Sequence, residues 1–427
     1  MRLALSKALA GCLALLSVAA LSACGGTGNN SSGSGAASDS TGSAGNVVDI
    51  YSSLPMRGPA AAEAVSVSNG IRLALAQSGG KAGRFKVDYT PLDDSAGASG
   101  WDASQTAANA RKAAADPRAV YYIGEFDDAA SEVSMPILNQ AGIAQVSPAN
   151  TYVGLTTSEL GSGSGGPPSA PTGTRTYLRI VPTDAVQAAA ELLAMRQAGC
   201  TKAAIASDGE AYGTGFARLV QLQRAYYGID IVRLGPINPG ARALRDDAAT
   251  LKSLHAGCFL LAGVVSKADV EVTKDIHAAL PRARIFGPQG MCNAAWTNPK
   301  DGGVPAAVDP LIECTQVTLS LPAYPGGKAF LAAYAARFPG STPSPYAILG
   351  YEAMRLGLST IAGLGDPGDS KSAVLSALFA TSGRHSVLGS YGFDKYGDTT
   401  LRSVGLYKVG PTGNPTYVKT LTPAHVL

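Results

Sequence analysis

The chain has 427 residues, of which 46% are hydrophobic and 15% are charged, and its formal net charge is +3. Loss of Arg2 and Lys7 with an N-terminal leader would leave a net charge of about +1, which excludes the basic patch expected of a nucleic-acid-binding protein. The length is too great for one small core, so two lobes are expected.

The N-terminus predicts a secretory signal peptide at residues 1–23. Basic residues Arg2 and Lys7 precede an apolar run at residues 8–20, and this run is too short to span a bilayer. The tetrad Leu21-Ser22-Ala23-Cys24 resembles a bacterial lipobox, which implies cleavage before Cys24 and a lipid on its sulfur. The alternative is an ordinary signal peptide with a chance cysteine near its end.

Residues 24–46 are predicted to be a flexible tether. Nearly all are Gly, Ser, Ala, Thr, Asn or Asp, a composition that cannot bury a core. The folded part is expected to begin at Val47, and no later stretch is apolar enough to span a membrane. We therefore expect an exported protein that a lipid on Cys24 anchors to the outer face of the cytoplasmic membrane.

The folded part alternates strand-like and helix-like segments. The expected strands are residues 47–55, 85–91, 120–126, 143–146, 177–181, 203–207, 229–234, 258–263 and 284–287. The expected helices are residues 59–75, 104–115, 130–142, 185–197 and 215–227. Such alternation predicts an α/β fold with parallel sheets covered by helices on both faces. A Gly-, Ser- and Pro-rich loop at residues 161–173 separates two such sets, which predicts two doubly wound lobes.

In an open parallel sheet, ligands bind beyond the carboxyl ends of the strands. The segments expected there are Ser52-Ser53, Asp93-Asp94, and residues 125–129, 147–151, 208–212, 263–266 and 287–290. Each alone is explained as readily by a helix cap or a turn. Their occurrence in both lobes indicates a binding site between the lobes.

Four cysteines remain after the leader and Cys24. Cys200 and Cys258 each precede a strand-like run, so they would share one edge of a parallel sheet if those strands are neighbours. This favours the disulfides Cys200–Cys258 and Cys292–Cys314 in an oxidising compartment. Free buried thiols are the alternative. No two cysteines have the spacing of metal ligands.

Catalytic motifs are not found in the sequence. The four histidines are far apart, no serine lies in a Gly-x-Ser-x-Gly elbow, and no Gly-Lys-Ser/Thr phosphate loop occurs. The run at residues 161–166 fits Gly-x-Gly-x-x-Gly by letter, but it lies in low-complexity sequence and does not close a strand. We expect neither an enzyme nor a cofactor or metal.

The loops resemble those of the branched-chain amino-acid-binding proteins, the type I periplasmic substrate-binding proteins of ABC transporters. The resemblance rests on residues 123–126, 136–143, 147–151, 211–215, 286–290 and 350–354, and it covers nearly the whole chain after Val47. It implies two Rossmann-like lobes joined by three crossover strands and closing around a small molecule. It also implies lobes at residues 47–175 with 316–385, and at residues 176–315 with 386–427.

Position by position, the resemblance implies a ligand site. Ala149 and Thr151 match the place where the family holds a ligand carboxylate with backbone groups and a hydroxyl. Tyr212 matches an aromatic residue of the second lobe that covers the ligand. Ala129 and Ser147, in the same strand-end loops, complete the predicted set.

Three positions depart from the family pattern. Asp128 stands where a serine commonly donates to the ligand carboxylate, and its charge would repel that group. It could instead cap the helix that starts after it. Gln289 replaces an acidic residue that pairs with the ligand ammonium, and Glu63 stands near a common tyrosine. An amine, an amide, a nucleobase-like molecule or a polyol would suit these residues better than a plain amino acid.

The expected function is a monomeric, lipid-anchored solute-binding protein that delivers an amino acid or a related amine or amide to an ABC permease. The alternative is a sensor that uses the same site to signal to a membrane partner. A weaker hypothesis is a surface protein whose site has lost its ligand.

Overall fold

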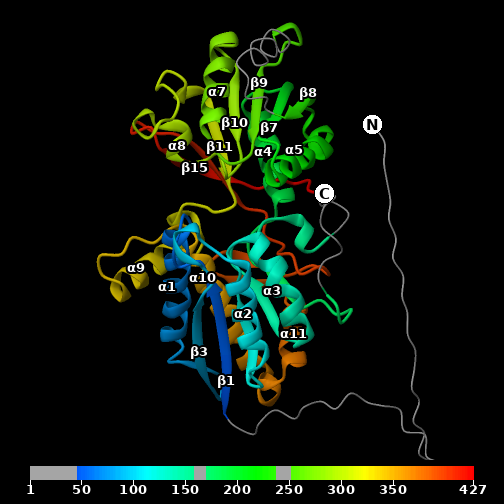
Figure 1. The fold of residues 1–427 in the computed structure, drawn as a ribbon, viewed down its shortest axis with the longest axis vertical. Coiled ribbons are helices and arrows are strands. Elements are labelled where there is room, and N and C mark those ends of the chain that lie inside the picture. Colours follow the sequence, from blue (N-terminus) through cyan, green and yellow to red (C-terminus); the bar gives the residue numbers. More distant parts are fainter. Residues whose placement is uncertain (1–45, 158–169, 237–251) are drawn as a thin grey trace, which may run out of the picture. The chain divides into compact units, whose positions relative to one another are not determined.

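The computed structural model describes residues 46–157, 170–236 and 252–427, which contain two separate, mostly parallel sheets (Figure 1). The first sheet has the strand order β2-β3-β1-β4-β5-β6. Its strands are β1 (Val47–Leu54), β2 (Lys81–Ala82), β3 (Phe85–Asp93), β4 (Ala119–Ile123), β5 (Ala144–Ser147) and β6 (Tyr177–Arg179). The predicted α/β class with doubly wound sheets is confirmed.

Helices cover both faces of the first sheet because the side chains of its strands alternate. Ile50 and Tyr121 belong to the core beneath α1, α10 and α11, whereas Tyr51 and Tyr122 belong to the core beneath α2 and α3. These helices are α1 (Ala61–Gln77), α2 (Ala103–Ala114), α3 (Asp128–Gln140), α10 (Ala347–Leu364) and α11 (Lys371–Phe379), and α9 (Gly327–Arg337) packs beside α1.

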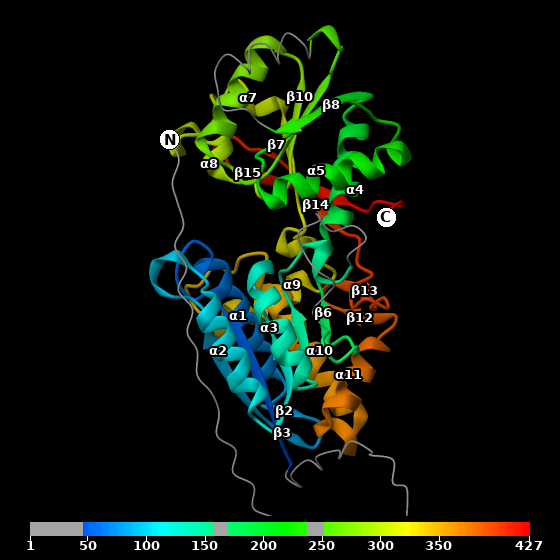
Figure 2. The ribbon, with the colours of Figure 1, turned by 45° about the vertical axis from the view of Figure 1, so that its right-hand side comes forward.

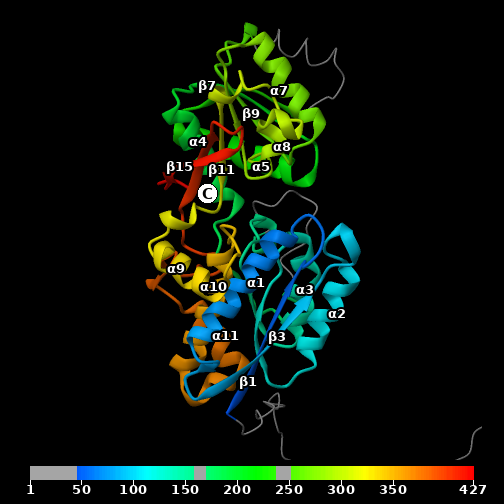
Figure 3. The same ribbon diagram turned by 90° about the vertical axis from the view of Figure 1, so that its left-hand side faces the viewer.

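The α1 and α10 helices lie side by side at close range (Figure 3). Glycines at the crossing make this approach possible. A Cβ at Gly70 would lie 2.0 Å from the Ala347 carbonyl oxygen, and a Cβ at Gly350 would lie 2.4 Å from that of Val67. Any side chain at either position would force the two helices apart.

The second sheet has the order β15-β14-β11-β10-β9-β7-β8, and its last two strands in sequence, β14 and β15, run antiparallel at one edge. Its strands are β7 (Lys202–Ser207), β8 (Asp230–Pro236), β9 (Cys258–Ala262), β10 (Arg284–Gly287), β11 (Ile312–Gln316), β14 (Val404–Val409) and β15 (Pro415–Leu421). Ile205 and Leu260 pack under α4 (Asp184–Gln197) and α5 (Ala211–Gln223), whereas Ala204 and Phe259 pack under α7 (Lys267–Ala279) and α8 (Ala294–Thr297).

Short elements complete the described chain. A hairpin pairs β12 (Arg384–Ser386) with β13 (Gly389–Tyr391). Single 3₁₀ turns lie at Gly97–Ser99, Val153–Leu155, Arg224–Tyr227, Pro299–Asp301, Asp309–Leu311, Leu321–Ala323 and Asp366–Asp369. Several helices start at side chains that accept a backbone N–H, as expected of N-caps: Asp102 at α2, Ser266 at α7 and Ser370 at α11.

The chain passes between the two sheets three times: from β6 to α4, from β11 to α9, and from β13 to β14. Figure 2 brings β6 and the β12–β13 hairpin into view. The β6 strand pairs with β5 in the first sheet, although the sequence places a lobe boundary at residue 175. The remaining boundaries stay predictions.

A buried guanidinium ties the first and third passages together. Arg179, on β6, is fully buried, and its Nε lies 2.6 Å from Oδ1 of Asp398, which precedes β14. Its other nitrogens donate to the carbonyl oxygens of Asn150 at 3.3 Å and Tyr152 at 2.7 Å, and to Oγ1 of Thr156 at 2.6 Å. One side chain thereby fixes the loop after β5 against the segment that enters the second sheet.

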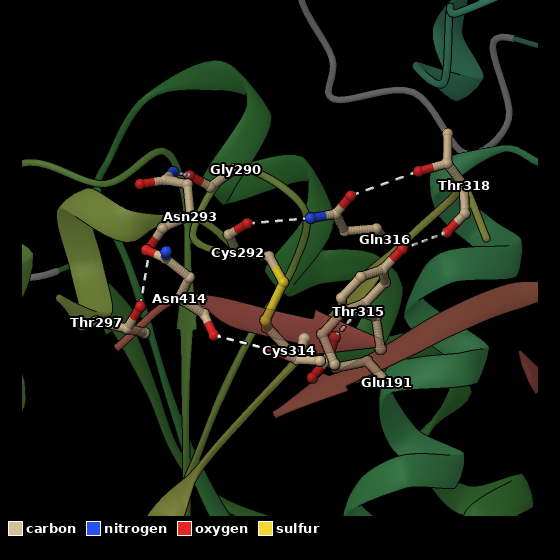
Figure 4. The surroundings of a disulfide bond; sticks show 12 residues. Glu191, Gly290, Cys292, Asn293, Thr297, Cys314, Thr315, Gln316, Thr318 and Asn414 are labelled. Atoms are coloured by element: carbon tan, nitrogen blue, oxygen red, sulfur yellow. Dashed lines mark hydrogen bonds between the residues drawn. A yellow bond between two sulfur atoms is a disulfide. The ribbon is translucent and has the colours of Figure 1, made fainter. Parts of the chain in front are cut away.

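The structure places both predicted cysteine pairs at disulfide distance. Cys200 and Cys258 have Cα atoms 5.9 Å apart, as expected once β7 and β9 are neighbours. Cys292 and Cys314 have Cα atoms 5.4 Å apart, and Gln316 donates to the Cys292 carbonyl oxygen at 3.0 Å (Figure 4). Both disulfides lie in the half of the molecule that holds the second sheet.

The leader, the tether and the lipid site on Cys24 lie outside the described residues, as does most of the expected loop at residues 161–173. Within the described residues, no helix combines the length and the apolar character needed to cross a bilayer.

Removal of either disulfide is expected to destabilise the protein, and the pair that closes the longer loop should contribute somewhat more. The Cys200–Cys258 pair spans 58 residues and the Cys292–Cys314 pair spans 22. In the chain-entropy model, double substitution to alanine lowers the free energy of unfolding by about 4 kcal/mol for the first pair and about 3 kcal/mol for the second. Urea unfolding measures both, and unchanged midpoints would show that these thiols do not pair in the native protein.

Removal of the Arg179 guanidinium leaves Asp398 without its opposite charge and the Asn150 carbonyl oxygen without its donor. Arg179→Ala is therefore expected to lower the free energy of unfolding by about 3–5 kcal/mol. The matched control is Arg84→Ala, because Arg84 pairs with Asp366 at the surface, where such pairs contribute about 0–1 kcal/mol. Equal midpoints for the two variants in urea would contradict the assignment of Arg179 as the anchor of the loop.

Candidate functional site

The site begins in the loop that follows β5, where every backbone N–H from residue 149 to residue 152 has an acceptor within the protein. The Ser147 hydroxyl donates to the Glu125 carbonyl oxygen at 2.8 Å. Its oxygen accepts from the N–H of Ala149 at 3.1 Å and of Asn150 at 3.0 Å. Ser147 therefore shapes the loop from inside and is itself fully buried.

Asp128 supplies the acceptor for the next two N–H groups. Its Oδ1 lies 3.0 Å from the nitrogen of Thr151 and 3.2 Å from that of Tyr152. Helix α3 has Asp127 at its N-cap position and Asp128 in its first turn, without a side-chain cap bond. Of the two roles that the sequence left open for Asp128, the structure does not show the helix cap, because its carboxylate accepts from the β5 loop instead.

Burial raises the pKa of Asp128 to about 6, although the guanidinium of Arg179 and the two N–H donors act in the opposite direction. The Asp128 carboxylate has lost much of its hydration, and Arg179 with the two N–H donors offsets only part of that loss. It will ionise fully only near neutral pH or above.

A second carboxyl group, Asp184, lies on the other side of Thr151. It occupies the first turn of α4, and its N–H donates to the Thr151 carbonyl oxygen at 2.8 Å. Asp184 is only 4% exposed, and its Oδ1 has no hydrogen-bond partner in the protein. Burial, followed by the charge of Asp128, raises its pKa to about 7, while the Thr151 hydroxyl and Arg179 lower it.

Thr151 connects this acid to the loop after β10. The Gln289 Nε2 donates to Thr151 Oγ1 at 3.3 Å. The Thr151 hydroxyl also lowers the pKa of the Asp184 carboxyl, and the Thr151 carbonyl oxygen accepts from the Asp184 N–H. The Gln289 Oε1 is buried without a partner. This chain joins the strand-end loops of the two sheets.

Aromatic rings border the same group. Tyr212, in the first turn of α5, lies against Gly290, where a Cβ would meet the Gly263 carbonyl oxygen at 2.4 Å and the Tyr212 ring at 3.1 Å. Burial, followed by Asp184, raises the Tyr212 pKa well above its usual value. Tyr346, at the start of α10, packs on Phe126 with ring centroids 5.2 Å apart.

Tyr346 also brings Glu63 into the electrostatics of the site. Burial raises the Tyr346 pKa, and the charges of Glu63, Asp128 and Asp184 raise it further. Glu63 lies in the first turn of α1 and is half-buried. Three carboxyl groups from three helices therefore act on one tyrosine.

A separate buried acid pair lies behind the loop after β4. Asp94 and Glu125 are both fully buried, and Tyr122 donates to Glu125 Oε1 at 2.9 Å. Burial raises the pKa of Asp94 to about 6, and burial together with Asp94 raises that of Glu125 well above its usual value. One shared proton satisfies such a pair, because two like charges at this range cannot both persist.

The structure thus assembles Ser147, Ala149, Asp128, Thr151 and Gln289 directly, with Tyr212 beside them and Glu63 at the edge. Ala129 is exposed in the first turn of α3 and makes no polar side-chain contact. Sequence reasoning missed Asp184, Arg179 and Tyr346. Asp184 could have been found, since it follows the expected strand at residues 177–181 and begins the expected helix at residue 185.

Among the described residues, no group of three or more His, Cys, Asp or Glu side chains is arranged to hold a metal ion. Surface hollows of about 260 and 350 Å³ lie between α1, β2 and α10 and beside β11, β14 and β15, respectively. Neither is lined by a predicted site residue.

The sequence matches the model of one known protein family. A family model described as periplasmic binding protein matches residues 52–414. No curated protein matches the chain by sequence.

Solved structures with this fold are numerous. An ABC transporter substrate-binding protein of Desulfitobacterium hafniense, in complex with leucine, has a TM-score of 0.68 at 18% identity, covering 87% of this chain and 99% of its own. A leucine-binding protein of Thermotoga maritima has a TM-score of 0.63 at 19% identity, covering 88% and 99%. A solute-binding protein of R. palustris, in complex with benzoate, has a TM-score of 0.63 at 17% identity, covering 89% and 98%.

These likenesses show the type I periplasmic binding protein fold that the loop motifs predicted. The family model covers most of the chain, including every residue of the assembled site and all strands of both sheets except β15 and the first part of β1. The chain belongs to the periplasmic binding protein family.

Proposed function

We propose that this protein is an extracytoplasmic solute-binding lipoprotein that captures a small polar molecule between its two lobes and delivers it to an ABC import permease. The observation that carries the proposal is the link from Gln289 to Asp184 through Thr151, whose hydroxyl oxygen accepts from Gln289 at 3.3 Å and whose carbonyl oxygen accepts from the Asp184 N–H at 2.8 Å. It joins strand-end loops of both sheets at buried polar groups, and the position fits the rule for ligand sites in α/β proteins.

The family and the structural neighbours support the class of function. The neighbours are substrate-binding proteins of ABC transporters, and those solved with ligands hold leucine, isoleucine or aromatic acids. An amino acid or a related amine or amide is accordingly the class of solute proposed for this chain.

The N-terminus supports the place of action. The signal-like residues 1–23, the lipobox-like tetrad and the Gly- and Ser-rich residues 24–46 fit a protein held by lipid on Cys24 at the outer face of the cytoplasmic membrane. A single protein molecule with its permease is sufficient for this role, and neither catalysis nor a cofactor is required.

Signalling to a membrane partner is the alternative, because it would use the same site and differ only in the outer surface. A permease and an ATPase encoded beside the gene would favour transport. A membrane kinase or cyclase there would favour sensing. A site that has lost its ligand is the third hypothesis, and failure to bind any solute would support it.

A thermal-shift screen of the full chain tests the function. The compounds are amino acids, amides, polyamines, nucleobases, sugars, polyols and benzoate. A ligand present at 100 times its dissociation constant stabilises the native state by about 2.7 kcal/mol, which corresponds to a rise of several degrees in Tm for a protein of this size. A flat result across the whole panel would contradict solute binding.

Thr151→Ala is expected to weaken solute binding at least about tenfold, since it removes the hydroxyl that accepts from Gln289 and lowers the pKa of Asp184. Calorimetric titration with the solute found in the screen measures the loss. Thr416→Ala, at an exposed position on β15, is the matched control and should bind normally. Equal affinities for the two variants would remove Thr151 from the site.

A further inference from the structure

The loop that would receive a ligand carboxylate already holds one. The loop resemblance predicts a ligand carboxylate at Ala149 and Thr151, yet the N–H groups of Thr151 and Tyr152 donate to Asp128 Oδ1. The N–H groups of Ala149 and Asn150 donate to the Ser147 hydroxyl. A ligand carboxylate would find no free backbone donor in this loop, and it would meet the charge of Asp128 at close range.

The cation nearest to this group is not available to a ligand either. Arg179 is fully buried and donates to Asp398, to Thr156 and to the carbonyl oxygens of Asn150 and Tyr152. Its charge is matched by Asp398 at 2.6 Å. The β5 loop and Arg179 therefore offer an anionic ligand neither a free backbone donor nor an unpaired positive charge, and the unpartnered donor beside them is the neutral Tyr212 hydroxyl.

Hydrogen-bond acceptors without a donor lie on the side of Thr151 that faces away from Asp128. Asp184 is 4% exposed with Oδ1 unpartnered, and the Gln289 Oε1 is buried and unpartnered. A buried acceptor without a donor costs free energy, so such atoms call for a partner that the ligand supplies. Glu63 and Asp128 add negative charge around them.

We propose that the site takes a small organic cation that donates N–H hydrogen bonds and carries no carboxylate, with Asp184 and Asp128 as its counter-charges. The inference rests on the proposed solute-binding function and specifies its ligand. A primary ammonium, amidinium or guanidinium group would donate to Asp184 Oδ1 and Gln289 Oε1. Asp128 supplies from within the chain the carboxylate that an amino acid would otherwise bring to the loop.

Matched pairs of ligands test the proposal on the full chain. Each pair is an amino acid and the amine that remains when its carboxylate is removed: leucine and isopentylamine, phenylalanine and phenethylamine, arginine and agmatine. At least one amine is expected to bind about 100-fold more tightly than its parent, because the parent adds a repelled and unpaired carboxylate.

Two substitutions, with a control, test the residues. Asp184→Asn should weaken binding of that amine at least about tenfold. Asp128→Ser frees the N–H groups of Thr151 and Tyr152, so it should weaken the amine and strengthen the parent amino acid. The control is Asp309→Asn, since Asp309 also has an unpartnered buried Oδ1 but precedes β11, at the far end of that strand from the site. Thermal melts of the three variants without ligand confirm that each folds.

The pH dependence has a defined sign. Asp128 and Asp184 hold their protons to about pH 6 and pH 7, so the amine affinity should rise about tenfold or more from pH 5 to pH 8. The charged or titratable groups that act on Asp184 or Asp128, besides each other, are Arg179, Asp127, Tyr177, Tyr212 and Tyr346. Behind them, Asp398 acts on Arg179 and Glu63 acts on Tyr346. A carboxylate ligand would show the opposite trend, since it binds best where these acids are neutral.

The outcomes separate the two proposals. Tighter or equal binding of a parent amino acid, of benzoate, or of a neutral amide or polyol alone would leave the solute-binding function standing and overturn the choice of ligand. Normal amine binding by Asp184→Asn would also overturn it. Absence of binding by every compound of the panel would overturn both.

Discussion

The site depends on one peptide group held between opposite charges. In the trans peptide that joins Asn150 to Thr151, the carbonyl oxygen and the N–H point in opposite directions. The carbonyl accepts from the buried Arg179 at 3.3 Å, and the N–H donates to Asp128 at 3.0 Å. Arg179 is in turn fixed by Asp398 of the third passage between the sheets. The Arg179 guanidinium and the Asp128 carboxylate therefore hold the Asn150–Thr151 peptide from opposite sides. A change in the position of either side chain would disturb the hydrogen bond that the other one makes.

This arrangement is costly for the free protein. The carboxyl groups of Asp128 and Asp184 have pKa values of about 6 and about 7, well above those of an unfolded chain. A group whose pKa is raised by folding stabilises the native state fully only below its unfolded pKa. Between about pH 4 and pH 7 the contribution of these two carboxyl groups to the stability of the native state therefore falls as the pH rises. An ion pair within the protein would lower these two pKa values and remove the loss of stability. A binding site whose cationic partner is the ligand keeps that loss in the free protein.

Much of the fold could be predicted from sequence because its signals are local. Every expected strand up to residue 287 exists, and the neighbouring positions of Cys200 and Cys258 followed from the strands that they precede. No helix or strand is predicted after residue 290, and the region of α10 is represented only by the family-like motif at residues 350–354. Its role rests on the close approach at Gly70 and Gly350, which involves residues 280 positions apart. Asp128 was recognised as a departure, but its partner was not. The two loops meet only because β4 and β5 pair in parallel, with Ile123 opposite Val146.

The departures from the family pattern make sense together once the geometry is known. A serine at position 128 would leave two N–H donors for a ligand carboxylate, and an acid at position 289 would then receive the ligand ammonium. Here Asp128 occupies those donors, so the negative charge is already inside the protein. A further acid at position 289, next to Asp128 and Asp184, would place a third carboxylate around Thr151 with no cation to offset it. Glutamine retains the acceptor without the charge. With Asp128 already at the N–H groups of Thr151 and Tyr152, glutamine at position 289 places an acceptor next to Thr151 without adding a third negative charge to those of Asp128 and Asp184.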